Sequence, residues 1–317
     1  MTHWLKTLLT AFTMAGLLAA CGGGDDHPPP APTIAQLAQQ QNLTALLAAA
    51  NKAGLSSTLA SGSVNLTVFA PTNAAFSALA TQLGFASADA LVAALPAPAL
   101  ANILNYHVLS TRQTAAQLAS GAATRATAYS FDGSPATLAL STSGGVSLTD
   151  AALTQANVTT ADVAASNGVV HVVDKVLVPP GVLNVVQMAQ VNPQFSTLVG
   201  AVVGANLAGT LSGAGPFTVF APTNQAFADI ASTVATLTPT QLSTVLTYHV
   251  IGSQVLAAQI PFGTPVATLA GGQTITIQNT PLRVIDTTAT PAPIAATDIR
   301  ASNGVIHVVT KVLIPAL

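Results

Sequence analysis

LTVFAPTNAAF occupies residues 66–76, and it returns as FTVFAPTNQAF at residues 217–227. In the first copy, Asn65–Ala70 is rich in β-branched and apolar residues, which predicts a buried strand. Pro71 ends that strand because it lacks a backbone N–H, and the hydroxyl of Thr72 can cap a following helix. Each copy therefore predicts a strand that turns directly into a helix. The corresponding residues of the second copy are Pro222 and Thr223.

The helix after the cap has an apolar face in both copies. Apolar residues recur at i, i+3, i+4 and i+7, which is the spacing of one helical face. They are Phe76, Leu79, Ala80 and Leu83 in the first copy and Phe227, Ile230, Ala231 and Val234 in the second. We expect this face to pack on the core, and we expect Phe69 and Phe220 of the preceding strands to be core residues.

Two further stretches recur in the same order. Tyr106-His107-Val108 returns as Tyr248-His249-Val250, and SNGVVHVVDKVL at 166–177 returns as SNGVIHVVTKVL at 302–313. Three ordered matches identify one domain duplicated in tandem, and 317 residues leave room for two domains of ordinary size. We place the first domain at 33–180 and the second at 181–317.

The segments between the motifs predict helices first and strands later. We expect helices at Ile34–Lys52, near Leu55, at Ser87–Ala94, at Ala97–Leu104 and, in the second copy, at Gln194–Val203. From Ala123 to Val173, alternating apolar and polar residues predict strands that form a sheet. The hairpin-turn signals are Asp132-Gly133, Gly144-Gly145 and Asn167-Gly168.

The composition is apolar and poor in charge. Hydrophobic residues make up 50% of the chain and charged residues only 6%, against about a quarter in ordinary domains. Eight Lys and Arg residues face ten acidic residues, all of which are Asp. Binding to nucleic acid needs clustered basic residues, and so does a polybasic membrane patch. The sequence therefore predicts no nucleic-acid partner and a surface of Ala, Thr, Ser, Gln and Asn.

The N-terminus resembles a bacterial export signal. An apolar run from Leu8 to Ala20 follows Lys6, which is typical of a signal peptide and short for a transmembrane helix. The run ends Leu-Ala-Ala-Cys, and Cys21 is the single cysteine of the chain. This ending resembles the bacterial lipobox, in which the Cys is acylated and becomes the new N-terminus. A plain secretory signal with an incidental Cys is the alternative.

The lipobox resemblance divides the N-terminal region into a signal peptide at 1–20 and a lipid-anchored flexible linker at 21–32. The linker reads GGGDDHPPPAP after Cys21, so it is flexible at its Gly residues and extended at its Pro residues. His27 is interpreted as a solvated linker residue. Because Gly22 rather than Asp follows Cys21, the resemblance implies an exported, lipid-anchored protein of the bacterial cell envelope, sorted to the outer membrane.

Together the repeated motifs resemble the fasciclin-like domain, whose signatures are a TVFAPTN-type stretch, a central Tyr-His and a C-terminal NGVIHVID-type strand. The resemblance covers almost everything after Pro32. It implies an α/β fold in which each copy is a wedge-like β-sandwich with helices along one edge. It also implies an extracellular adhesion or matrix-binding module without enzyme chemistry, cofactor or metal.

The sequence departs from the family pattern at two places. The family often has an acidic residue after the Thr-Asn pair, where it would complete a capping box, but Ala74 and Gln225 stand there. Animal members that bind integrins are thought to use an Asp-Ile pair just before the Tyr-His. This chain has Asn102-Ile103 and Thr244-Val245 instead, so the resemblance does not support integrin binding.

Chemistry could reside in the four histidines of the repeats, which occupy two positions seen twice. A strand places His171 on the same face as Val169 and Val173, so a buried, hydrogen-bonded imidazole is favoured over a ligand or catalytic group. The histidines lack metal-ligand spacing, and we assign no catalytic residue, metal or cofactor. A cap and a turn are likewise favoured over catalysis for Thr72 and Asn73. The histidines are His107, His171, His249 and His307.

Two function classes remain open from the sequence. The first is a surface or periplasm-facing adhesion protein, acting as a monomer, that recognises matrix polymer, polysaccharide or protein. The second is a carrier or sensor that binds an apolar small molecule in a groove of one repeat. A large apolar pocket would favour the carrier, and a flat Thr- and Asn-rich face would favour adhesion. Asp162 and Asp298 correspond between the copies, and a turn-forming or exposed role is expected for them.

Overall fold

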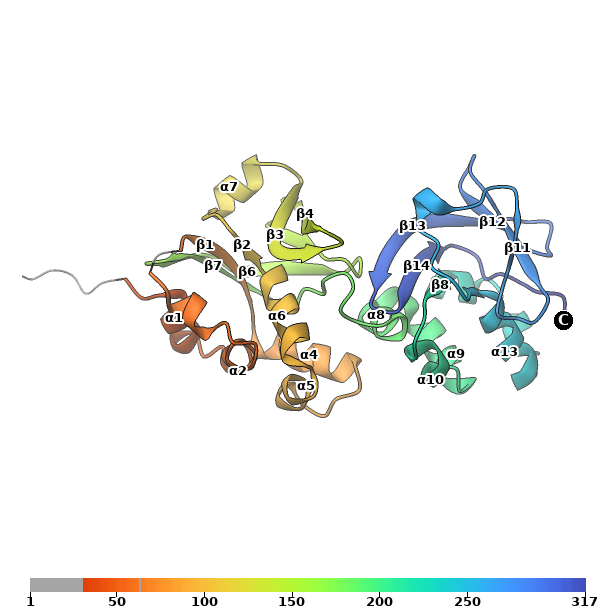
Figure 1. The fold of residues 1–317 in the computed structure, drawn as a ribbon, viewed down its shortest axis with the longest axis horizontal. Helices are drawn as coiled ribbons and strands as arrows, with labels where there is room; N and C mark the ends of the chain where they lie inside the picture. The colour runs from red at the N-terminus through yellow and green to blue at the C-terminus, as the bar shows by residue number, and fades with distance from the viewer. Residues whose placement is uncertain (1–30, 63) are drawn as a thin grey trace, which may run out of the picture. The chain divides into compact units, whose positions relative to one another are not determined.

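The computed structural model describes residues 31–62 and 64–317 (Figure 1). The expected signal peptide, the lipidation residue Cys21 and nearly all of the linker lie outside the described residues. Within them, each repeat begins with helices and continues into a sheet, as the order of the sequence signals predicted.

The first repeat combines seven helices with one seven-stranded sheet among the described residues. The helices are α1 (Ile34–Gln40), α2 (Thr44–Lys52), α3 (Ser56–Ala60), α4 (Asn73–Gln82), α5 (Ala88–Ala94), α6 (Ala97–Tyr106) and α7 (Ala115–Ser120). The strands are β1 (Leu66–Pro71), β2 (Val108–Leu109), β3 (Thr124–Phe131), β4 (Ser134–Ser141), β5 (Ser147–Thr149), β6 (Gln155–Ala165) and β7 (Gly168–Val173). Their order in the sheet is β2-β1-β7-β6-β5-β4-β3.

The second repeat has the same order of elements and a sheet of the same topology. Its α-helices are α8 (Val185–Val191), α9 (Ser196–Gly204), α10 (Ala208–Ser212), α11 (Asn224–Ala228), α12 (Ala231–Val234) and α13 (Pro239–Tyr248), with 3₁₀ turns at Pro193–Phe195 and Ala257–Gln259. Its strands are β8 (Phe217–Pro222), β9 (Val250–Ile251), β10 (Pro265–Ala267), β11 (Thr274–Gln278), β12 (Arg283–Ile285), β13 (Ala292–Ala301) and β14 (Gly304–Val309).

The signature strand lies near one side of each sheet, beside the last strand of its repeat. β1 pairs in parallel with β7, and Phe69 lies opposite His171; β8 pairs with β14, and Phe220 lies opposite His307. The Asn-Gly turn allows this close pairing, because a Cβ atom on Gly168 would collide with the carbonyl of Leu66. The two most recognisable motifs of each copy are therefore neighbours in the sheet.

Each sheet encloses one apolar core and covers a second. Phe69 of β1 packs in a cluster with Leu138 of β4 and Leu148 of β5, so strands from both ends of the sheet face each other across this core. Phe220 lies in the equivalent cluster of the second repeat. Both phenylalanines are fully buried, as expected. The helices α1, α2, α4 and α6 supply apolar side chains to the other core, together with alternate residues of β1 and β7. The α/β prediction is confirmed.

The predicted single helix at Ile34–Lys52 is wrong, because the chain forms α1 and α2 with a turn between them. Asn42 has a φ of 56°, a left-handed conformation that a helix does not accept. The side chain of Asn73 holds this turn: its Nδ2 donates to the carbonyl of Asn42 and its Oδ1 accepts from the N–H of Ala45. Apolar spacing continued through the turn and concealed it.

The expected helix after the second signature is also only partly right. In the first repeat α4 runs unbroken and buries Phe76, Leu79 and Ala80. In the second repeat α11 ends at Ala228 and α12 begins at Ala231, so Phe227 is buried but Ala231 is exposed. The apolar face therefore packs as predicted in one copy only.

Among the described residues, no single helix has the length and apolar character needed to cross a membrane. The consecutive helices α5 and α6 meet that requirement of length and composition only as a pair, and they are bent by 117°.

Candidate functional site

The central histidine of each repeat lies where a helix meets the sheet. His107 follows the last residue of α6 and caps that helix, and His249 does the same for α13. The Nδ1 atom of His107 lies 2.7 Å from the carbonyl of Ile103, and its Nε2 lies 2.8 Å from the N–H of Leu177. Because an N–H must donate to Nε2, the proton of the neutral ring is on Nδ1 and donates to Ile103.

The same bonds recur in the second repeat, where His249 contacts the carbonyl of Val245 at 2.7 Å and the N–H of Leu313 at 2.8 Å. Burial lowers the pKa of both His107 and His249 to about 4, because a charged ring would lose its hydration. Each imidazole is therefore neutral at pH 7, with both nitrogens engaged in joining a helix end to the segment after the last strand.

The second pair of histidines lies on the last strands. His171 is fully buried and stacks on Phe69, with ring centroids 5.6 Å apart. Its Nε2–H donates to the carbonyl of Gln113, and its Nδ1 accepts from the N–H of Asp162. His307 makes the equivalent contacts with Phe220, Val255 and Asp298, and burial lowers its pKa. These rings anchor loops to the sheet.

Asp162 and Asp298 do not lie in the Asn-Gly turn that follows them. They lie within β6 and β13 at bulges, with φ angles of 59° and 60°. The carboxylate of Asp162 accepts from the N–H of Ala115 at the start of α7, and Asp298 accepts from Ala257. Both side chains are exposed, but each shapes the loop that its neighbouring histidine also anchors.

The tyrosines beside the central histidines are buried with a defined partner. The hydroxyl of Tyr106 donates to the carbonyl of Thr137, and that of Tyr248 donates to Thr274. Burial raises the pKa of Tyr248 to about 12, and it also raises the pKa of Tyr106. Neither phenol is available for proton transfer near neutral pH.

A buried aspartate in each repeat was missed by the sequence reasoning. Asp150 accepts hydrogen bonds from the N–H groups of Ala152, Thr154 and Val178, and Asp286 accepts from Thr288 and Ile314. Burial raises the pKa of Asp150, whereas the hydrogen bonds that Asp286 accepts hold its pKa below the usual range. The available signal was the equal spacing of these aspartates from Lys175 and Lys311.

Thr72 and Thr223 cap their helices through their hydroxyls, at 3.1 and 3.3 Å from the N–H groups of Ala75 and Ala226. These contacts place Ala75 and Ala226 at the third helical position, where a capping box would need its acidic residue. The earlier assignment of Ala74 and Gln225 to that position was therefore wrong by one residue. Neighbouring Pro71 and Pro222 are the last residues of β1 and β8.

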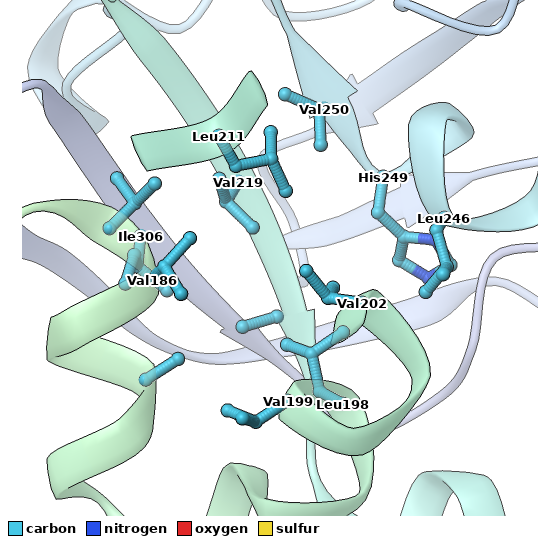
Figure 2. Close-up of a pocket in the computed structure, with 13 residues that line it drawn as sticks. Val186, Leu198, Val199, Val202, Leu211, Val219, Leu246, His249, Val250 and Ile306 are labelled. Atoms are coloured by element: carbon cyan, nitrogen blue, oxygen red, sulfur yellow. The ribbon is translucent and has the colours of Figure 1, made fainter. Parts of the chain in front are cut away.

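An apolar cavity lies between the helices and the sheet in each repeat. In the second repeat, side chains from α8, α9 and the sheet gather around one apolar space, with the ring of His249 at its edge (Figure 2). This cavity measures about 30 Å³. The first repeat has a larger one of about 130 Å³, whose wall includes His107, Val68 and Val170.

A second candidate surface is the outward face of β3 and β4, which pair antiparallel. The exposed side chains alternate with buried ones such as Leu138. All are small and uncharged: Thr124, Ala126, Ala128, Ser130, Pro135, Thr137, Ala139 and Ser141. This hairpin face therefore presents two strands of Thr, Ala, Ser and one Pro to solvent. Among the described residues, no group of three His, Cys, Asp or Glu side chains could hold a metal ion.

Each repeat is an α/β domain whose sheet carries buried Phe, Tyr and His residues at equivalent positions. Sequence comparison identifies the family of this domain. A family model for the fasciclin domain matches residues 41–179 and 193–315. The chain therefore belongs to the fasciclin-domain family and carries two tandem copies of the domain.

Relatives occur in bacteria and animals. Protein sll1483 of Synechocystis sp. is 43% identical over 141 residues, which are 43% of this chain and 75% of that protein. The transforming growth factor-beta-induced protein ig-h3 of Sus scrofa is 31% identical over 265 residues, 80% of this chain but only 35% of that protein. Immunogenic protein MPB70 of Mycobacterium bovis is 33% identical over 39% of this chain and 65% of its own length.

The comparison with solved structures gives one further similarity. The FAS1 domain pair of the insect cell adhesion molecule fasciclin I matches 89% of this chain and 95% of that chain, at 17% identity and a TM-score of 0.43.

Proposed function

We propose that this chain is a lipid-anchored binding protein of the bacterial cell envelope, which recognises matrix polymer, polysaccharide or protein through its fasciclin domains. Membership of the fasciclin family supports a binding module. The lipobox-like ending at Cys21 supports a membrane anchor in the outer membrane, and the Gly- and Pro-rich linker would hold the domains away from it. The protein would act as a monomer.

The observation that carries the adhesion proposal is the outward face of the β3–β4 hairpin. Its residues are short and uncharged, so an extended polymer can approach the strands without displacing long side chains or stripping water from charges. The pairs Thr124 with Ala139 and Ala126 with Thr137 bring hydroxyl and methyl groups together across the hairpin. Hydroxyl groups offer hydrogen bonds, and methyl groups offer apolar contact, as a sugar polymer or peptide requires.

The histidines support binding rather than catalysis. In each repeat the central imidazole uses both nitrogens in hydrogen bonds to backbone groups, and so does the imidazole on the last strand. A general base must have a nitrogen within reach of a substrate proton. We therefore propose that the chain performs no enzymatic reaction through these residues.

The adhesion proposal is tested with the full chain carrying Cys21→Ser, so that binding is measured without the lipid. The immobilised protein is incubated with separated polysaccharide and protein fractions of the cell envelope. Ala126→Lys with Thr137→Lys should abolish retention, and the matched control Ala126→Ser with Thr137→Ser should preserve it. Retention that survives the two lysines would exclude the hairpin face as the binding surface.

A second candidate function is favoured by the cavity of the first repeat. An apolar pocket of about 130 Å³ between the helices and the sheet, bordered by the exposed residues Gln41 and Thr58, supports a carrier or sensor of an apolar small molecule. Extraction of the purified protein with organic solvent, followed by mass spectrometry, tests this. A stoichiometric apolar compound is expected, and its absence from freshly isolated protein would contradict the carrier.

A further inference from the structure

The two cavities occupy the same place in the duplicated fold but differ in size. Both are bounded by the signature strand, the last strand, the central histidine and the first helices of their repeat. Val68, His107 and Leu59 in the first repeat correspond to Val219, His249 and Leu211 in the second. The volume nevertheless falls from about 130 Å³ to about 30 Å³.

At two equivalent positions the second repeat has the larger side chain. Val170 of β7 is replaced by Ile306 of β14, and both residues line their cavities. Ala50 of α2 is replaced by Val202 of α9, and Val202 reaches the cavity wall, as Figure 2 shows. These exchanges add carbon atoms to the side chains at equivalent positions of the second repeat. Side chains therefore occupy most of the cavity in the second repeat, whereas the equivalent cavity in the first repeat stays open.

The wall of the larger cavity selects for an uncharged ligand. Most of it is apolar, with Leu37 from α1, Leu46 from α2 and Leu104 from α6 facing Val68 and Val170 of the sheet. The polar residues on its lining are few, and two of them, Gln41 and Thr58, are exposed. A charged group would lose its hydration here without gaining a partner. An apolar cavity of about 150 Å³ stays dry and accepts benzene.

We propose that the first repeat, and not the second, binds a compact uncharged apolar molecule of about the size of one ring, held between α1, α2 and the β1–β7 pair. Any single polar group of that molecule would point toward Gln41 and Thr58. This proposal deepens the carrier function given above as the second candidate, and its variants leave the hairpin residues Ala126 and Thr137 unchanged.

Benzene is the probe, and the protein is the full chain carrying Cys21→Ser. Hydrogen–deuterium exchange read by mass spectrometry reports β1 and β8 as separate peptides. Bound benzene stabilises the folded first repeat against opening. At a benzene concentration tenfold above its Kd, hydrogen exchange of the β1 peptide should therefore slow by roughly tenfold. Exchange of the β8 peptide should not change. Calorimetric titration should give one benzene per chain.

Two reciprocal variants use the duplication as its own control. Ala50→Val with Val170→Ile places the side chains of the second repeat in the first, and benzene affinity should fall at least tenfold while circular dichroism is preserved. Val202→Ala with Ile306→Val should create a second benzene site and protect the β8 peptide. If the filled double variant fails to fold, Val170→Ile alone serves, with a smaller loss of affinity.

Equal protection of both repeats by benzene, or protection of neither, would overturn the proposal, and so would undiminished binding by the folded filled variant. These outcomes are separable from failure of the carrier function. If the protein binds benzene in the first repeat but no compound is extracted from protein isolated from cells, the binding site is confirmed and the carrier role is not. Loss of envelope binding in the lysine variants concerns the hairpin face alone.

Discussion

The Nε2 atom of His107 accepts a 2.8 Å hydrogen bond from the backbone N–H of Leu177, and Leu313 donates the same bond to His249 in the second repeat. Each bond joins the end of a helix to the segment after the last strand, across 70 residues of sequence in the first repeat and 64 in the second. Because the acceptor nitrogen must be unprotonated, the bond exists only with a neutral ring. This chemistry makes the fold sensitive to acid.

The first prediction concerns that sensitivity. Both central histidines have a folded pKa of about 4, below the unfolded value of 6.5, so the unfolded chain binds protons first as the pH falls. Their stabilising contribution is complete above pH 6.5 and is lost as the pH approaches 4. Between pH 7 and pH 5, each histidine should lower the free energy of unfolding by about 2 kcal/mol, measured by urea denaturation.

His249→Gln is the matched variant for the acid effect. It should be less stable than the natural chain at pH 7 by about 1–3 kcal/mol, because the N–H of Leu313 loses a well-placed acceptor. It should also lose less stability between pH 7 and pH 5, since one titrating ring has been removed. An unchanged pH dependence in a double variant of His107 and His249 would show that other groups cause it. If the His249→Ala protein is stable but has lost its binding activity, the imidazole of His249 has a functional role rather than a structural one.

The second prediction concerns the signature strand. Phe220 is fully buried in a core cluster made only of residues of the second repeat. Phe220→Ala should therefore cost about 3–5 kcal/mol. Hydrogen exchange of the β8 peptide should accelerate, while exchange of β1 should stay close to its original rate. Phe220→Leu, which keeps more of the volume, should be milder, and acceleration of β1 as large as that of β8 would refute independent repeats.

The third prediction compares two lysines at equivalent positions. The ammonium of Lys311 lies 3.1 Å from Oδ2 of Asp286, whose side chain is fully buried. Lys175 acts on buried Asp150 through its charge, and Asp150 takes its hydrogen bonds from backbone and threonine groups. Lys311→Met should cost about 1–3 kcal/mol because it leaves a buried carboxylate short of a partner. Lys175→Met should cost less in the same urea experiment, and the reverse order would contradict this account.

The fourth prediction concerns the anchor. Cells producing the natural chain should yield the protein in the membrane fraction, labelled by radioactive palmitate. Cys21→Ser should release the protein and remove the label, because a thiol is needed for acylation. The control Gly24→Ser, in the linker, should leave both unchanged. Absence of label from the natural chain would remove the basis for a lipid tether.

Local motifs made much of this fold predictable. The strand around Phe69, the cap at Thr72 and the duplication itself are visible because each rests on a few adjacent residues that occur twice. The break between α1 and α2 was not predictable, because Asn42 turns under the control of Asn73, which follows 31 residues later. Helical periodicity alone carries no information about such a contact.

The candidate sites depended still more on tertiary structure. The sequence shows Val at 170 and Ile at 306, but only the fold shows that both side chains enter the same space beneath the helices. Asp150 and Val178 are likewise brought together only when the strands have paired. Sequence reasoning identified the histidines as buried, hydrogen-bonded groups but could not name Leu177 or Gln113 as their partners.

The parallel pairing of β1 with β7 also sets the order of events when the chain is made. Leu66 lies opposite Gly168. About a hundred further residues must therefore be synthesised before β1 can pair with β7. Such distant contacts form slowly because a long loop must close first. A chain emerging from its N-terminal end, from a ribosome or through a membrane, cannot complete the first domain until the last strand has followed.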